Sequence, residues 1–242
     1  MFHRLITEKL LCFDRAVRCV YYNSQVITNR KDLGMSDVKT IKFAVHGTTS
    51  RFMSKEFEDA VKDLTPADVG AKLELHINST GGSLGSAWAI YNRASLLFLP
   101  QDITTFAEGC CDSSALLLLM LGNTRVGFSS SHFLFHEASH SFEGESEVPL
   151  SRLEDMVRES RIKETQYEEV LASRACSDSG LGMSRFFRPR LKVFRSWIRA
   201  QGSTTIGATT ALSHNIITQL CCLDGHVETQ EGNEYEFYDF GA

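Results

Sequence analysis

The sequence predicts an α/β domain, and two observations carry this prediction. Segments with the composition of β-strands alternate with segments of helical periodicity from residue 39 onward, a pattern typical of βαβ crossovers. The chain has 242 residues, 43% of them hydrophobic, which is enough for one sizeable core plus a small appendage. We expect an N-terminal extension at 1–35, a main domain at 36–222 and an acidic tail at 223–242.

The first half of the main domain predicts strands wherever short β-rich or alternating segments end in turn residues. It predicts helices wherever apolar residues recur every three or four positions. Ser54 is the expected N-cap of the first helix, and Thr65-Pro66 breaks that helix. In chain order we expect strand 39–46, helix 55–64, strand 71–78, helix 83–98 and strand 102–106.

The second half begins with a Leu-rich run that predicts a buried helix ending at Gly122. Ser151 and Glu154 have the spacing of a capping box and predict the start of a long helix. The segment 177–207 carries no readable periodicity. We expect helix 113–121, strands 125–129 and 133–136, helix 151–174, helix 208–214 and strand 216–222.

Composition and charge narrow the functional classes. A net charge of −5 with interspersed signs gives no electrostatic reason to expect nucleic acid. The longest apolar run, 115–121, is shorter than the roughly 20 residues that a membrane-spanning helix needs. No secretory signal pattern follows Met1. Seven cysteines without CxxC spacing indicate reduced thiols, so we expect a cytoplasmic protein.

Three features have the residue types of an acyl-transfer site. Ser113 lies at a strand-to-helix turn, His136 ends an apolar strand, and Gly81-Gly82 leave another strand. A serine needs an adjacent base and an oxyanion site to attack a carbonyl, and the N–H of Ser114 at the helix start can donate to such an oxyanion. The alternatives are a helix cap for Ser113, a hydrogen-bonded core or rim residue for His136 and an ordinary turn for the glycines.

Two other functions have weaker support. His132, Glu137 and His140 flank His136, but they lack HExxH or CxxC spacing, so we expect no metal and no cofactor. A basic aromatic run at 186–195 can contact nucleic acid, but in an acidic chain we expect a solvated helix face or a subunit contact.

Three motifs together resemble the Clp protease proteolytic subunit family, a serine peptidase family of the Clp/crotonase fold. They are Ile77-Asn78-Ser79-Thr80-Gly81-Gly82-Ser83, Gly109-Cys110-Cys111-Asp112-Ser113-Ser114-Ala115 and Phe133-Leu134-Phe135-His136. The resemblance runs from about 41 to 136, continues weakly through the handle-like helix 151–174 and returns at 208–220. It implies stacked ββα units with a protruding handle helix.

The resemblance implies Ser113 as nucleophile, His136 as base, and the N–H groups of Gly82 and Ser114 as oxyanion hole. This sequence departs from the family pattern at Thr80, where the family has proline, and at Cys111-Asp112, where it has two alanines. The family's third residue, an aspartate before the closing helix, has no counterpart in Gly202-Ser203-Thr204-Thr205. Asp178 is the nearest acid, and a hydroxyl or carbonyl near Ser203 or Thr204 is the alternative we favour.

The resemblance therefore implies a serine endopeptidase that works through an acyl-enzyme, needs no cofactor and acts on peptides or unfolded proteins. It also implies a homo-oligomeric ring, fed by a separate ATP-driven unfoldase, with no nucleic acid or membrane partner. Two alternatives stay open. One is a catalytically weak or inactive structural subunit of such a ring, because the acid is missing. The other is a crotonase-type acyl-CoA enzyme, which shares the fold.

Overall fold

The computed structural model describes residues 38–64, 70–139, 149–177, 184–200, 202–223 and 226–229. The chain divides into two compact units, Met1–Lys39 and Thr40–Ala242, and all the elements below belong to the second. The predicted boundaries at 35 and 222 stay predictions, as does the tail, within which residues 227–229 form a short strand. No described helix is both long enough and apolar enough to cross a membrane.

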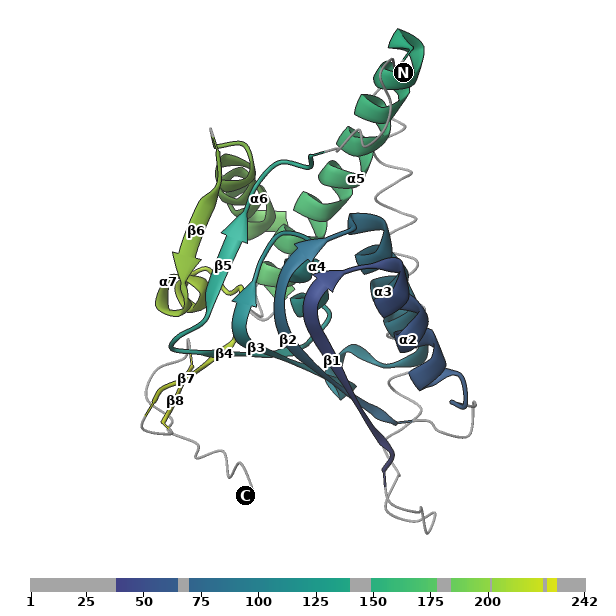
Figure 1. Ribbon diagram of the computed structural model, residues 1–242. Coiled ribbons are helices and arrows are strands. Elements are labelled where there is room, and N and C mark those ends of the chain that lie inside the picture. Colours follow the sequence, from purple (N-terminus) through teal and green to yellow (C-terminus); the bar gives the residue numbers. More distant parts are fainter. Residues whose placement is uncertain are drawn as a thin grey trace. The chain divides into compact units, whose positions relative to one another are not determined.

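A predominantly parallel sheet forms the centre of the second unit (Figure 1). Its main path has the strand order β1-β2-β3-β4-β7-β8, and β5 pairs with both β3 and β6. The pairs β1–β2, β2–β3, β3–β4, β4–β7 and β3–β5 are parallel, whereas β7–β8 and β5–β6 are antiparallel. The strands are β1 (Thr40–Thr49), β2 (Lys72–Gly82), β3 (Ile103–Cys111), β4 (Thr124–Phe128), β5 (His132–Phe135), β6 (Thr204–Gly207), β7 (Gln219–Cys221) and β8 (Val227–Thr229).

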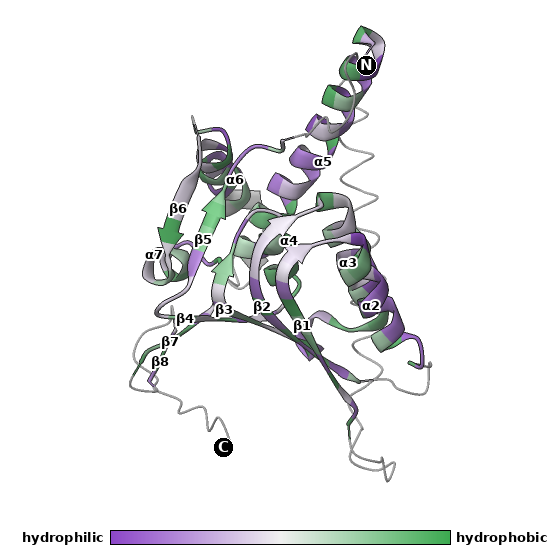
Figure 2. Cartoon of the chain, in the orientation of Figure 1, coloured by the Kyte–Doolittle hydropathy of each residue, from purple (hydrophilic) through white to green (hydrophobic). Residues whose placement is uncertain are grey.

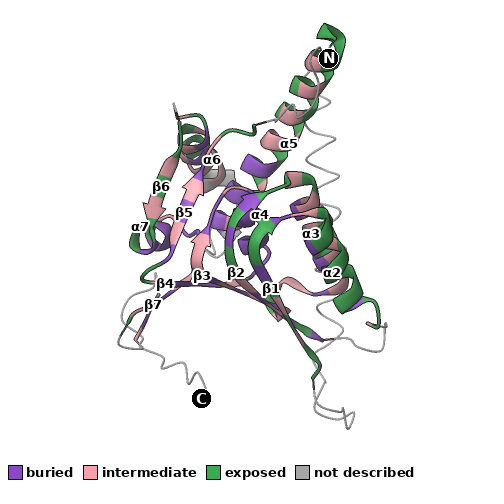
Figure 3. Cartoon of the chain, viewed as in Figure 1, coloured by how far each residue is buried: buried purple, intermediate pink, exposed green. Residues whose placement is uncertain are grey.

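The helices cover one face of the sheet. Helices α2 and α3 contact β1, and α4 contacts β2 and β3. Along β2 the side chains of Leu73, Leu75 and Ile77 are fully buried beneath them. Figures 2 and 3 show the alternation of apolar and polar, buried and exposed residues along these strands. The helices are α2 (Arg51–Val61), α3 (Leu84–Leu97), α4 (Ala115–Leu119), α5 (Leu150–Ser177), α6 (Ser184–Ile198) and α7 (Ala208–Ser213), with a 3-10 turn η2 (Pro100–Asp102) before β3.

Two predicted helix starts are wrong by a few residues. Helix α2 begins after Ser50, whose side chain accepts from the N–H of Met53 at 3.3 Å, while the Ser54 hydroxyl donates to the Arg51 carbonyl inside the helix. Helix α5 begins at Leu150, so Ser151 lies within its first turn instead of capping it. At α2 the cap is a serine one turn earlier than predicted, and at α5 the start differs from the prediction by one residue, the usual variation of helix ends.

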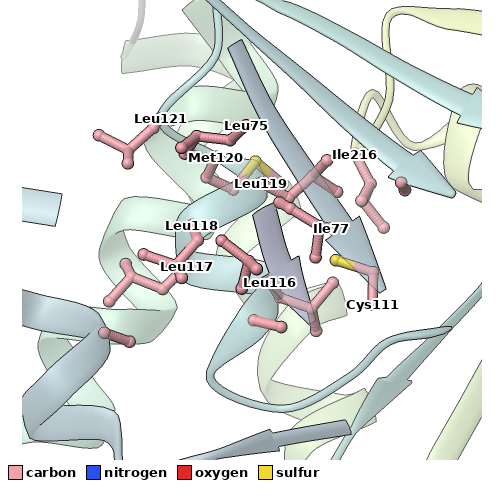
Figure 4. Packing of buried hydrophobic residues seen from close by; sticks show 14 of the residues in the cluster. Leu75, Ile77, Cys111, Leu116, Leu117, Leu118, Leu119, Met120, Leu121 and Ile216 are labelled. Atoms are coloured by element: carbon pink, nitrogen blue, oxygen red, sulfur yellow. The ribbon is translucent and has the colours of Figure 1, made fainter. Parts of the chain in front are cut away.

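Helix α4 is the centre of the core. Its five residues and the next two are buried, from Ala115 to Leu121, and they pack against Leu75, Ile77, Cys111 and Ile216 (Figure 4). Its free carbonyl end is satisfied by Arg174 of α5, whose Nε donates to Met120 O at 2.8 Å and whose Nη2 donates to Gly122 O at 2.8 Å. The helix is shorter than the predicted 113–121, and it is anchored at both ends.

Helix α6 and strand β6 come from the segment that the sequence left unassigned. Helix α6 packs along α5 and buries Phe194 and Ile198. Arg195 of α6 and Arg199, which directly follows this helix, bind the fully buried Glu168 of α5, with Arg195 Nε at 2.7 Å and Arg199 Nη2 at 3.1 Å. These contacts explain why a basic aromatic run folds into a helix here.

Candidate active site

Ser113 lies on the turn between β3 and α4 in a left-handed backbone conformation, with φ of 54°. This conformation is uncommon for a residue with a side chain and persists only where neighbours enforce it. Its N–H donates to Leu134 O at 2.8 Å, and its carbonyl accepts from the hydroxyl of Tyr167 at 3.0 Å. The turn is thus fixed from β5 on one side and from α5 on the other, and Ser113 itself is half-buried.

Gly81 lies directly against this turn, and the next residue, Gly82, lies against the end of β1. A Cβ on Gly81 would be 2.6 Å from both Asp112 O and Ser113 Cβ, and a Cβ on Gly82 would be 2.6 Å from Thr49 O. Both glycines have positive φ, 83° and 138°. Only residues without side chains allow this approach and this backbone. The predicted grouping of the glycine turn with Ser113 is therefore present in the fold.

The N–H of Ser114 faces the same glycine turn, because a Cβ on Gly81 would lie 3.1 Å from Ser114 N. Within the described part of the chain this N–H has no hydrogen-bond partner, whereas the N–H groups of Ala115 and Leu116 bond back to Asp112 O and Ser113 O. The buried Ser114 hydroxyl is also unpartnered there. An unpaired N–H one residue after a serine is the geometry that an oxyanion hole needs.

His136 follows the last residue of β5 and is half-buried. Its Nδ1 lies 2.6 Å from the carbonyl oxygen of Glu137. A carbonyl can only accept, so Nδ1 carries the proton and Nε2 of the neutral ring has a free lone pair. Among the described residues no hydrogen bond joins Ser113 Oγ to His136.

The third position of a catalytic triad has three possible sources. Asp178 lies outside the described residues. Strand β6 pairs Thr204 with Phe135 and Thr205 with Leu134, so the same register brings Ser203 opposite His136, although no hydrogen bond joins them in the described part. The Glu137 carbonyl already occupies Nδ1 of His136.

Asp112 adds a carboxylate beside the serine. Its side chain is largely buried, and Oδ1 accepts from the N–H of Leu134 at 3.1 Å. Burial raises the pKa of the Asp112 carboxyl above its usual value, and the neighbouring His132, the Leu134 N–H and His136 oppose this effect. Asp112 and Ser113 therefore both bind the backbone of Leu134, one through its carboxylate and the other through its N–H.

Sequence reasoning missed two of these contacts. Tyr167 lies within the predicted helix 151–174, and a buried tyrosine hydroxyl usually finds a hydrogen-bond partner, a rule that points to a polar contact. Burial raises the pKa of the Tyr167 phenol well above its usual value, and Cys111 adds to the effect, so Tyr167 stays a neutral donor. The Glu137 carbonyl gave no sequence signal, because every residue has one.

Three further sequence predictions concern the basic aromatic run, the cysteines and His140. Phe194 of the basic aromatic run is buried against Phe135 and Trp197, so this side of the run packs in the core. None of the described cysteines, at positions 110, 111, 176, 221 and 222, forms a disulfide bond. His140, one of the three residues considered for a metal, lies outside the described residues.

The fold and the site define a class: a parallel α/β domain with stacked ββα units, in which a serine on a strained strand-to-helix turn lies beneath a glycine turn. The profile of the Clp protease family matches residues 40–174. A ClpP1 point mutant from Listeria monocytogenes has a similar structure, with a TM-score of 0.57 at 10% identity over 74% of this chain and 90% of that chain. At that identity the structural match shows the fold alone.

Sequence relatives agree with the profile. The chain is 32% identical over 104 residues to ATP-dependent Clp protease proteolytic subunit 3 of Frankia casuarinae, which is 42% of this chain and 48% of that protein. It is 31% identical over 112 residues to subunit 3 of Rhodococcus jostii, 46% of this chain and 52% of that protein. The matched stretch spans about half the length of these relatives. The chain belongs to the Clp protease family, and the predicted Clp/crotonase-like fold is confirmed.

Proposed function

We propose that the chain is a serine endopeptidase that cleaves peptide bonds through an acyl-enzyme. Ser113 Oγ attacks the substrate carbonyl while His136 Nε2 takes the serine proton. The N–H groups of Gly82 and Ser114 donate to the oxygen as it becomes an oxyanion. The C–N bond then breaks, His136 gives its proton to the leaving amine, and water hydrolyses the ester by the same steps.

One observation supports this proposal most: the positive φ of Ser113 under the glycine turn. A helix cap needs no such strain, since an N-cap normally has extended backbone. Ser83 at the start of α3 illustrates this, with φ of −65°, ψ of 109° and its hydroxyl accepting from Ser86 N. Strain that neighbouring contacts maintain is typical of functional turns.

We also propose that the Glu137 carbonyl acts as the third group. It selects the His136 tautomer in which Nε2 can accept a proton, the role that an aspartate has in serine proteases. A neutral carbonyl stabilises the imidazolium less than a carboxylate does. Asp178→Asn should then leave turnover near that of the wild type. If Asp178 were the orienting acid, this variant should lose about 10⁴-fold.

A non-catalytic ring subunit is the second candidate. It is favoured by the missing hydrogen bond between Ser113 and His136 in the described part of the chain. Apo enzymes often show long catalytic contacts that tighten on substrate binding, so the peptidase is compatible with the same geometry. Membership of the Clp protease family favours both over a crotonase-type acyl-CoA enzyme.

The experiment is hydrolysis of fluorogenic peptides by purified wild type, Ser113→Ala and His136→Ala. Matched controls are Ser196→Ala, an exposed serine whose hydroxyl bonds only within α6, and His46→Ala, whose side chain is 59% exposed. The proposal predicts that both site variants lose hydrolysis and that both controls retain it. Absence of hydrolysis in the wild type supports the structural subunit, whereas hydrolysis that persists in Ser113→Ala would overturn the assignment of Ser113 as the nucleophile.

The assembly and its partners belong to the same proposal. We propose a homo-oligomeric ring that receives unfolded protein from an ATP-driven unfoldase in the cytoplasm. Exposed apolar side chains along α5, Leu150, Val157 and Ile162 at 71%, 51% and 54%, support a helix that another subunit covers. Light scattering at micromolar concentration should show an oligomer, and a strict monomer would exclude the ring.

A further inference from the structure

A second group of reactive side chains lies beside the serine turn. The ligand atoms of Cys110, Asp112 and His132 all lie within 4.8 Å of one another. Nε2 of His132 is 3.7 Å from Oδ2 of Asp112. In the part of the chain that the structure describes, no other group of three histidine, cysteine or acidic side chains converges in this way.

The fold holds this group in place without any ion. Cys110 at the end of β3 is paired with His132 at the start of β5. The Cys110 N–H donates to Oδ1 of Asn78 at 3.1 Å, which fixes the backbone beneath the thiol. Oδ1 of Asp112 accepts from Leu134 N, and its other oxygen, Oδ2, is the one closest to His132. The three ligands therefore come from two segments that the sheet joins.

The donor set selects the metal. In a tetrahedral zinc site, with Zn–S near 2.3 Å and Zn–N and Zn–O near 2.0–2.2 Å, neighbouring ligand atoms are about 3.3–3.6 Å apart. The imidazole and carboxylate of this group already lie 3.7 Å apart, so the longest separation has to shorten by roughly 1 Å, within reach of a side-chain rotation. A thiolate ligand disfavours Mg²⁺ and Ca²⁺, which prefer oxygen.

The solvent exposure and the charge of these three side chains also suit Zn²⁺. The His132 side chain is 45% exposed and that of Asp112 10% exposed, and Cys110 is half-buried. Solvent therefore reaches one side of the group and can supply a fourth ligand. A thiolate and a carboxylate together balance the charge of a dication. Binding displaces the thiol proton to solvent.

We propose that Cys110, Asp112 and His132 form a Zn²⁺ site with water as fourth ligand. The sequence predicted no metal because these ligands lack a linear motif and belong to two separate strand ends. The ion would lie one residue from Ser113 and on the Asp112 carboxylate. If the proposed peptidase function holds, its positive charge would disfavour a protonated His136 and inhibit acylation. That consequence depends on the proposed function, whereas the site does not.

The test is direct metal binding to the reduced full-length protein. Co²⁺ serves as the spectroscopic probe, and Zn²⁺ affinity is measured by competition with a chromophoric chelator. The wild type should bind one equivalent that shows a thiolate-to-cobalt charge-transfer band and the intense visible bands of a tetrahedral centre. Cys110→Ser should lose the charge-transfer band, and His132→Gln should weaken Zn²⁺ by at least about 100-fold, since even outer-shell changes cost 10–100-fold.

The matched control is Cys222→Ser. Cys222 is also half-buried and also lies beside a carboxylate, with its Sγ 3.7 Å from Glu228 Oε1, but it belongs to no such group of three. This variant should bind like the wild type. The site would be overturned if the wild type bound no metal or if the charge-transfer band persisted in Cys110→Ser. It would also be overturned if Cys222→Ser weakened Zn²⁺ binding as much as His132→Gln does. Urea unfolding of each variant confirms that it is folded, and no readout depends on peptide hydrolysis.

Discussion

Replacing Gly81 by alanine tests the close approach of the glycine turn to the serine turn. The new Cβ would lie 2.6 Å from Asp112 O and 2.6 Å from Ser113 Cβ, and neither atom belongs to a flexible side-chain end. Holding an L-residue at the φ of 83° found at Gly81 costs about 1–2 kcal/mol. Overpacking typically adds about 1–3 kcal/mol, so we expect a total loss of roughly 2–5 kcal/mol.

Gly47→Ala is the matched control. Gly47 has nearly the same φ, 75°, but a Cβ there meets nothing within 4 Å. It should lose only the conformational part, about 1–2 kcal/mol. Urea unfolding of both variants measures the difference. Gly81→Ala should also slow acylation of Ser113 more than tenfold. A displaced serine turn raises the activation free energy, and an increase of about 1.4 kcal/mol already slows a reaction tenfold. Equal destabilisation of the two variants, with normal acylation in both, would refute the packing described for the turn.

Three further predictions concern single contacts. Tyr167→Phe removes one of the two hydrogen bonds to the Ser113 carbonyl, which keeps the bond from the Leu116 N–H, and should cost about 0.5–1.5 kcal/mol, the usual net contribution of one hydrogen bond, as urea unfolding will measure. Arg195→Ala weakens the pairing of the fully buried Glu168 and should cost about 1–3 kcal/mol, below the full buried-pair value because Arg195 is partly exposed and a second arginine remains. Burial and a nearby arginine charge lower the pKa of His214. The unfolded chain therefore takes up a proton near pH 6.5 before the folded chain does, and wild-type stability should fall more steeply than that of His214→Asn as the pH drops below about 6.5.

Controls for these variants come from the same chain. Tyr91→Phe removes a hydroxyl that makes no bond to the serine turn and should cost less than Tyr167→Phe. Arg158→Ala breaks an ion pair with Asp155 whose two side chains are 71% and 72% exposed, and such pairs contribute about 0–1 kcal/mol. Equal losses in Arg158→Ala and Arg195→Ala would contradict the role given to Glu168. Parallel pH curves for wild type and His214→Asn would contradict the shift at His214.

The sequence predicted the parts of the fold in which local pattern and tertiary burial agree. Strand β2 alternates because one face packs on helices, and α3 begins at Leu84, directly after the capping serine Ser83. The meeting of Gly81 with Ser113 also followed, since neighbouring parallel strands end at the same edge. The family motifs lie on these turns, where backbone geometry restricts residue type most strongly.

The sequence did not reveal features that depend on distant partners. Helix α6 contains Pro189 and a run of arginines, and its order comes from burial of Phe194 and from Glu168 on another helix. Strand β6 is four residues long and pairs only with β5 among the described strands. Short edge segments of this kind carry too few residues for a periodic signal. The convergence of Cys110 with His132 likewise follows from sheet pairing alone.

The most direct test of the central claim is the site of covalent modification by a fluorophosphonate. Folded wild-type protein is incubated with the probe, digested and mapped by mass spectrometry. We expect a single adduct on Ser113 that is absent from Ser113→Ala and from heat-unfolded protein, while Ser114 stays unmodified. An adduct at another serine, or none on folded wild-type protein, would contradict the assignment of Ser113 as the nucleophile.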